Sequence, residues 1–335
     1  MLQSANGRAS VPLRAYGKLA LTAEYLRVGC DDHPAATEYA RWIDDGFKWA
    51  EAVCGRRGFH VQNHRIVFTH DRGRLWIIAC IWDSADVSTE QGGGRRFPFT
   101  LFAILPAGDA RRDPHSVACT CGPIWQELEV HFSELGISSD RTDFTRRVRA
   151  RGLALGPQSD FANQLMLQAK NLPLTTWLSG ALDGTASEAL LFARLQTAIL
   201  ELENAPLAGQ GWVQLPMSAN LDKMVQLDSW IGWLALNAPR TLSDYSILLP
   251  SVNGNRGCSL WVSPRAPQPD GFLLLSQERD HIRQVLGDRQ IMAIEDEERS
   301  GESLLNALRG NFTLESGTLF DLAGCRFPRP SMRPR

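Results

Sequence analysis

The sequence lacks any apolar run of the roughly 18 to 20 residues that a helix needs to cross a bilayer. Residues 1–9 also lack the apolar core of a secretory signal. Both absences predict a soluble, cytoplasmic protein without direct membrane insertion. The seven cysteines agree with this compartment, because an odd number at irregular spacing is a poor disulfide framework in a chain of 335 residues. We expect several of them to be small, buried apolar side chains.

An excess of charge of either sign is also missing. The chain has 35 lysines and arginines against 37 aspartates and glutamates, and its formal net charge is −2. Acidic and basic residues are mixed along the sequence, apart from local arginine clusters. This balance argues against nucleic acid or another long polyanion as the partner.

The common sequence signatures of catalysis are absent as well. The chain has no Gly-x-Ser-x-Gly nucleophile elbow and no Ser-x-x-Lys motif with its companions. Residues 92–96 (GGGRR) lack the second glycine, lysine and Ser/Thr of a phosphate-binding loop and are typical of a turn before a strand. Residues 295–298 (EDEE) lack the alternating ligands of an EF-hand and indicate a solvated acidic loop. We therefore predict no catalytic residue and no cofactor.

Histidines and cysteines leave a metal site open as an alternative. The candidate ligands are His60, His64, His70, His115, Cys119 and Cys121. Their spacing is not that of a structural zinc site, since Cys119 and Cys121 lack a second, distal pair. On a strand these two cysteines would point the same way, so geometry allows ligation, but buried or edge cysteines are the simpler interpretation. We expect His60 and His64 to be solvated at the end of a hairpin.

Residues 94–106 are the most informative segment that is present. A glycine turn and an arginine pair lead into Pro98, which favours an edge or bulge position at the start of a strand. The run from Phe99 to Leu105 is continuously apolar, as in a strand that is buried on both faces. Such a strand belongs in the middle of a sheet.

The first part of the chain predicts helices packed on an antiparallel meander. We expect strands at 13–19, 61–69, 75–82 and 97–105, a helix that begins at His33-Pro34 and ends before 55–58, and helices at 124–135 and 144–150. The Asp71-x-Gly73 turn joins two of these strands as a hairpin. Trp42, Trp49, Trp76 and Trp82 are expected in the core. This order predicts an α/β sandwich.

Glycines and a proline at 152–157 predict a domain boundary. Beyond it we expect helices at 161–169, 186–203, 221–237, 276–286 and 301–309, and strands at 245–250, 258–263 and 271–275. The predicted fold class is α/β (α+β), with a domain at 12–151 and a helix-rich α+β domain at 157–326. Residues 1–11 and 327–335 are predicted to be disordered.

Two segments of the first domain resemble the TagF (ImpM) family, accessory proteins of the bacterial type VI secretion system. The family opens with a strand reading Gly-Lys-Leu-Pro, two variable residues and Gly-Asp-Phe-Val, and carries a later Gly-Arg-x-Phe-Pro-Leu-Thr strand. Here Gly17, Lys18 and Leu19 match, Ala20 replaces the proline, residues 23–26 (AEYL) stand for Gly-Asp-Phe-Val, and residues 94–100 (GRRFPFT) fit almost completely. Trp42-Ile43 and residues 65–68 (RIVF) resemble the family's helix tryptophan and Trp-Arg-Phe strand.

The resemblance implies a longin-like or profilin-like N-terminal fold and a non-enzymatic, post-translational repressor of type VI secretion. The implied partner is a forkhead-associated scaffold protein of the apparatus. An arginine fork at a strand end could meet a carboxylate or phosphate of such a partner. The positions that we assign to partner binding are Lys18, Glu24, Arg27, Gly94, Arg95 and Arg96.

Two other functions stay open. One is a metal-dependent hydrolase that uses the histidines or the cysteine pair named above. The other is a structural adaptor that promotes type VI assembly instead of restraining it. The departures at Ala20 and Ala23 also leave room for a divergent family member with a different partner.

Overall fold

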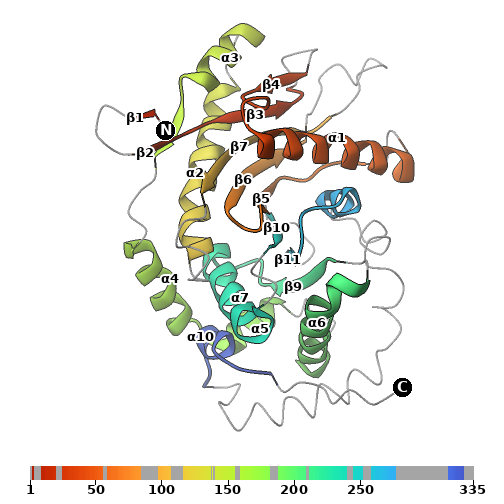
Figure 1. Ribbon diagram of the computed structural model, residues 1–335. Helices are drawn as coiled ribbons and strands as arrows, with labels where there is room; N and C mark the ends of the chain where they lie inside the picture. Colours follow the sequence, from red (N-terminus) through yellow and green to blue (C-terminus); the bar gives the residue numbers. More distant parts are fainter. Residues whose placement is uncertain are drawn as a thin grey trace.

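The computed structural model describes residues 2–3, 9–19, 25–55, 59–83, 97–106, 116–136, 138, 140–154, 159–181, 188–208, 211–239, 244–251, 258–276 and 316–327. Within them the protein is mixed α/β, with an eight-stranded antiparallel sheet between helices, as predicted (Figure 1). Among the described residues, no helix is long and apolar enough to cross a membrane.

The large sheet has β7 among its inner strands. Its order is β4 (Leu26–Val28), β3 (Arg14–Gly17), β7 (Phe99–Pro106), β6 (Leu75–Trp82), β5 (His64–His70), β10 (Ser246–Pro250), β11 (Cys258–Ser263) and β9 (Val213–Met217). Strand β7 pairs with β3 on one side and β6 on the other, and it is buried from Phe99 to Leu105. The prediction of a strand in the middle of a sheet is confirmed.

Two hydrophobic layers cover the two faces of this sheet. Helix α1 (Pro34–Cys54) and the 3₁₀ helix η4 (Pro269–Ser276) pack on one face, together with Ile66 and Phe68 of β5. Helices α2 (Ser116–Leu135) and α7 (Lys223–Asn237) pack on the other, together with Val67. Neighbouring residues of β5 therefore enter opposite layers, as the pleat of a strand requires.

Local signals explain where α1 begins and ends. Its N-cap is His33, whose Nδ1 accepts a hydrogen bond from the Ala35 amide at 3.2 Å, and Pro34 occupies the first turn. Gly55 ends the helix with a φ of +77°. Inside the helix, Gly46 allows close packing, because a Cβ there would lie 2.6 Å from the Phe272 side chain. The predicted helix is confirmed, and it packs directly on η4.

Three expectations about individual elements need correction. Residues 271–275 form part of η4 and not a strand; their uniformly apolar sequence is fully buried, and such a run does not distinguish a buried strand from a buried helical segment. Cys119 and Cys121 lie in α2, which begins before the predicted helix and continues through Pro123. Side chains that are two positions apart on a helix point in different directions. The strand geometry that would let both cysteines bind one metal ion therefore does not apply.

Some of the other helices lie near their predicted positions, and other elements have no counterpart in the sequence prediction. Helices α3 (Arg141–Arg149), α4 (Ser159–Asn171) and α6 (Glu188–Ala208) match predicted helices, whereas α5 (Leu174–Ala181), α10 (Leu319–Ala323) and strand β9 were not predicted. The helices expected at 276–286 and 301–309 and the acidic residues 295–298 lie outside the described residues.

The large sheet joins the two predicted domain ranges. Strand β5 of 12–151 pairs with β10 of 157–326, from His64 opposite Pro250 to Phe68 opposite Ser246. At the predicted boundary, β8 (Gly152–Ala154) pairs with β2 (Ala9–Pro12), which also pairs with β1 (Leu2–Gln3). Residues 9–11 are therefore strand in a range that was predicted to be disordered. Phe327, at the other end, is only 7% exposed.

Candidate functional site

The two segments that carry the family resemblance meet at one corner of the large sheet. Gly17, the last residue of β3, lies opposite Phe99 of β7, and the Lys18 amide donates a hydrogen bond to the Pro98 carbonyl oxygen at 3.3 Å. Strand β4 extends the sheet beside β3, with Arg27 opposite Tyr16. We define the motif corner as Tyr16, Gly17, Lys18, Tyr25, Arg27, Phe97 and Pro98.

Gly17 is the residue that allows this close approach. Its φ is +111°, a backbone conformation that residues with a side chain rarely adopt. A Cβ at this position would overlap the Pro98 carbonyl oxygen. The glycine of the first motif and the proline of the second are thus coupled physically, although 80 positions separate them in the sequence.

Aromatic rings fill the corner around Phe97. This buried ring meets the edges of Tyr25 at 4.7 Å, Phe47 at 5.0 Å and Tyr16 at 6.1 Å between centroids. Tyr25 is 43% exposed, so it reaches solvent while it also contacts the buried Phe97 ring. A large aromatic side chain that is held rigidly and left partly exposed is a typical anchor of protein interfaces.

Charged groups of the corner are already paired within the chain. The Arg27 guanidinium donates to Oδ1 of Asp31 from Nε at 2.9 Å and from Nη2 at 2.7 Å, and it lies 5.8 Å from the Tyr16 ring centre. Tyr16 in turn donates a hydrogen bond to Asp44 at 2.6 Å; burial and this carboxylate raise the pKa of the phenol. The Arg27–Asp31 pair is exposed and therefore weak, so a partner carboxylate can replace Asp31.

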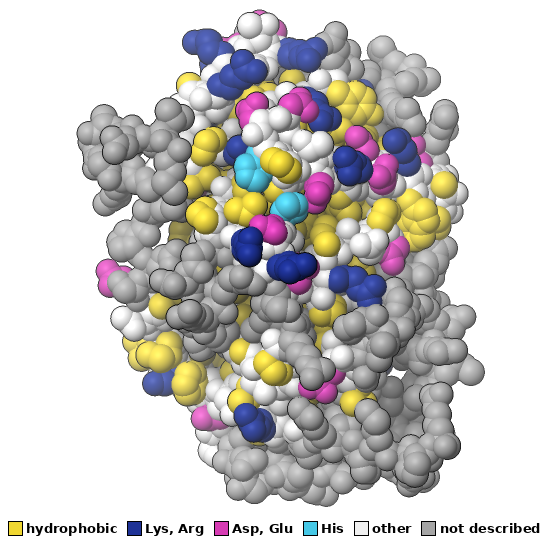
Figure 2. Space-filling view, in the orientation of Figure 1, with side chains coloured by type: hydrophobic (Ala, Val, Ile, Leu, Met, Phe, Trp, Pro, Cys, Tyr) yellow, Lys and Arg dark blue, Asp and Glu magenta, His cyan; other side chains and the backbone are white. Residues whose placement is uncertain are grey.

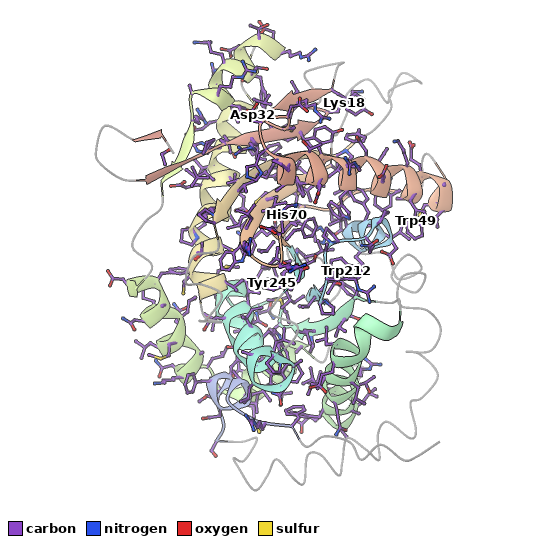
Figure 3. All side chains as sticks on the ribbon, in the orientation of Figure 1. Lys18, Asp32, Trp49, His70, Trp212 and Tyr245 are labelled. Carbon is purple, nitrogen blue, oxygen red and sulfur yellow. The ribbon has the colours of Figure 1, made fainter. Side chains whose placement is uncertain are left out.

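Two of the six predicted partner-binding residues lie in the described part of the chain. Arg27 is at the surface of the corner, but Lys18 is only 8% exposed and is buried at the strand end (Figure 3). Glu24, Gly94, Arg95 and Arg96 lie outside the described residues. Tyr16, Tyr25 and Phe97 were not predicted as site residues, although Tyr25 and Phe97 belong to the two matched motifs.

The histidines of the metal alternative are not brought together. His64 is fully buried, which corrects the expectation of a solvated side chain, and its Nδ1 donates to the Gln62 carbonyl oxygen at 2.8 Å. His70 lies at the other end of β5, about 20 Å away by strand geometry, and contacts Glu38 at 2.7 Å. His60 is 3.7 Å from Asp83. His115 lies outside the described residues.

Burial also governs the chemistry of His64 and of the cysteines. Loss of hydration lowers the pKa of His64 to about 4, so its imidazole is neutral in the folded protein at neutral pH. Cys119 and Cys121 are both buried in the core, and burial raises the pKa of the Cys121 thiol. Among the described residues, no group of three or more His, Cys, Asp or Glu side chains could hold a metal ion.

Comparisons with known proteins found few similarities. No protein-family model matches the sequence, and no curated protein matches it. Among solved structures, the chain is similar to the crystal structure of PA0076 from Pseudomonas aeruginosa PAO1, with 15% sequence identity and a TM-score of 0.42. That similarity covers 79% of this chain and 94% of PA0076.

Proposed function

We propose that this protein is a non-enzymatic, cytoplasmic regulator that restrains type VI secretion by binding a forkhead-associated scaffold protein of the apparatus. The observation that supports this most is the motif corner. Two segments that resemble the TagF (ImpM) family are distant in sequence, yet they pair through Gly17 and Pro98 at one end of the sheet. A shared structural role explains why both motifs occur together in one chain.

The surface of the corner suits the binding of a protein partner. Tyr25 offers a rigid apolar anchor, and Arg27 offers a fork that can exchange its exposed Asp31 partner for a carboxylate of the scaffold. Binding of this kind masks the scaffold in a stoichiometric complex. The amount of the protein, and not a turnover rate, then sets the strength of the effect.

Capture from a lysate of the native host tests this proposal. The tagged protein should retain the forkhead-associated scaffold, and a Tyr25→Ala/Arg27→Glu variant should retain much less. The control Val53→Ala/Arg74→Glu truncates another exposed apolar side chain and reverses the charge of another exposed arginine; Arg74 lies in the β5–β6 turn, at the opposite end of β6 from the corner. Absence of the scaffold with wild-type protein would overturn the proposed partner.

Two further variants separate the remaining explanations. An Arg95→Glu/Arg96→Glu protein tests the second motif, and retained capture would place the interface elsewhere. Stoichiometric metal in the purified protein would favour the hydrolase alternative. The described residues contain no group of three or more His, Cys, Asp or Glu side chains that could hold that metal. Measuring secretion after deletion of the gene separates a repressor from an adaptor that promotes assembly.

A further inference from the structure

We infer that α3 forms a second contact surface, which binds an acidic segment of a protein partner. This inference rests on the proposed function, because it names the partner's chemistry beside the motif corner. Helix α3 packs against β3 and β4, the two strands that build this corner. A partner at the corner can therefore reach α3 without a change in the fold.

The composition of this segment is unusual for a chain of balanced charge. Residues 140–151 hold five arginines, no lysine and two aspartates. The arginines are Arg141, Arg146, Arg147, Arg149 and Arg151. In Figure 2, basic side chains gather at the top of the molecule, where Figure 1 shows α3. The local excess of positive charge is thus concentrated on one short helix.

Packing of α3 leaves Arg141, Arg146 and Arg149 exposed, whereas Arg147 and Arg151 are half-buried. Phe144 and Val148, four residues apart on the helix, are 1% and 0% exposed and form its buried stripe. The Arg146 side chain, by contrast, is 75% exposed. The buried stripe fixes the helix on the sheet corner, so the arginines form a surface with a defined orientation.

Acidic groups compensate only part of the charge. Arg151 is paired with Glu134 of α2, at 2.7 Å between Nη1 and Oε2. Asp140 is the N-cap, and its carboxylate accepts a hydrogen bond from the Asp143 amide at 2.9 Å. Asp143 is shared by Arg146 and Arg147. One carboxylate between two guanidiniums holds both in place and leaves positive charge to attract a further anion.

Helix stability accounts for some of these arginines but not for all. Arg146, Arg147 and Arg149 lie in the last turn, where a cation is favoured by the helix dipole. Arg141 is the first residue of α3, where a cation is disfavoured by the same dipole. The helix dipole therefore does not account for the charge at Arg141.

The chemistry of the surface favours a short acidic segment of protein. Arginine, unlike lysine, presents a planar fork that matches a carboxylate at two points. Nine residues of helix span about 13 Å, the length of about four extended residues of a partner. A long polyanion such as nucleic acid would extend past this patch onto a protein whose net charge is −2.

Titration with a fluorescein-labelled decaglutamate peptide, followed by anisotropy, tests the inference on the full chain. Arg146→Glu/Arg149→Glu should weaken binding at least about tenfold, since two attractive contacts become repulsive. Arg146→Lys/Arg149→Lys keeps the charge and should weaken it only a few-fold, through loss of the fork. The control Lys48→Glu/Arg74→Glu makes the same charge change at side chains 71% and 69% exposed and should bind like wild type.

Two results of the binding titration would overturn the acidic-segment inference. One is equal peptide binding by wild type and the Arg146→Glu/Arg149→Glu variant, with circular dichroism confirming that both are folded. The other is tighter binding of wild type to a single-stranded DNA oligonucleotide of equal charge, which would make nucleic acid the better ligand.

Scaffold capture with the same variant separates this inference from the proposed function. If wild type and the α3 variant capture the scaffold equally, the proposed function stands and the inference fails. If wild type captures no scaffold, the proposed function fails, and the peptide titration decides on α3 by itself.

Discussion

At the scale of single residues, backbone conformation and burial determine which substitutions the motif corner and the core tolerate. Gly17 has a positive φ directly beside the Pro98 carbonyl group, so any side chain meets both strain and overlap. His64 is a polar residue held in the core, where burial keeps its ring neutral and the hydrogen bond to the Gln62 carbonyl places the proton on Nδ1. Neither residue is at the surface of the proposed interface, but each can be tested by one substitution.

Replacement of Gly17 by alanine should lower the free energy of unfolding by at least about 2 kcal/mol, because the new Cβ displaces the Pro98 carbonyl. Gly55→Ala is the matched control. It also has a positive φ, of +77°, but no described atom lies within 4 Å of its Cβ, so we expect about 1 kcal/mol from backbone strain alone. Urea unfolding measures both, and equal losses would contradict the coupling of the two motifs.

His64 should make stability depend on pH. The buried ring has a pKa of about 4, whereas an unfolded chain titrates near 6.5, so between these values the unfolded state binds more protons. Stability is then lost as pH falls from about 6.5 to 4, by at most about 1.4 kcal/mol per pH unit. His64→Leu should make this decline shallower, as measured by urea unfolding across the window.

The matched control for the pH experiment is His60→Leu, at a side chain that is 45% exposed. Because His60→Leu removes an exposed histidine, a decline as shallow as that of His64→Leu would show that burial of the ring is not the cause. An unchanged slope in His64→Leu would show that the buried ring contributes nothing to the decline.

At the scale of elements, the segment from Ser316 to Phe327 shows how a late part of the chain is held. Asn237, at the end of α7, accepts a hydrogen bond from the Phe327 amide at 2.8 Å and donates one to the Cys325 carbonyl at 3.0 Å. The Phe327 ring packs against Trp233 and Phe192. One buried amide side chain and one ring thus fasten α10 to α7.

Substitution of Asn237 by leucine should release this segment. The amide of Phe327 and the carbonyl of Cys325 would stay buried without partners, at a cost of about 2 to 4 kcal/mol. Hydrogen exchange should then speed up at residues 319–327 more than in the large sheet. Thr318→Ala, which removes only the N-cap of α10, should cost about 1 kcal/mol; unchanged exchange in the Asn237 variant would contradict the role of this clamp.

The same scale shows why some elements could be predicted and others could not. Helix α1 carries its own boundary signals at His33, Pro34 and Gly55, so short-range sequence defines it. Residues 271–275 are buried on every side, and a uniformly apolar run does not distinguish a strand from a 3₁₀ helix. Strand β9 contains Pro216, which an edge strand tolerates but which hides the strand pattern.

The site was predictable only in part for a similar reason. The two motifs were identified by resemblance, but their contact through Gly17 and Pro98 depends on strands far apart in the chain. The burial of Lys18 and of His64 follows from the layers that cover the sheet, which no local pattern contains. The sequence therefore could not show which residues of the two motifs reach the surface.

At the scale of the whole molecule, the two predicted domain ranges share both a sheet and a helical layer. Strands β5 and β10 pair across the ranges. On the face covered by α1, Trp42 donates an indole hydrogen bond to the Gln268 carbonyl at 3.0 Å, and Gly46 packs on Phe272. Separation of the ranges would leave two apolar strands with open edges.

We therefore expect the protein to unfold in one cooperative transition. Tryptophan fluorescence and far-ultraviolet circular dichroism should report the same urea midpoint, because tryptophans on both sides of the 152–157 boundary belong to the joined layers. The fragment 12–151 alone should aggregate through the exposed edge of β5. Two separate transitions would instead support independent domains.

The measurement that tests the central claim most directly is type VI secretion in the host, compared between wild type, a deletion of this gene and a strain that overproduces the protein. A stoichiometric repressor predicts that secretion rises in the deletion and falls in the overproducer. Complementation with Tyr25→Ala/Arg27→Glu should restore repression poorly, whereas Val53→Ala/Arg74→Glu should restore it fully. Secretion that falls on deletion, or does not change in any strain, would contradict the account.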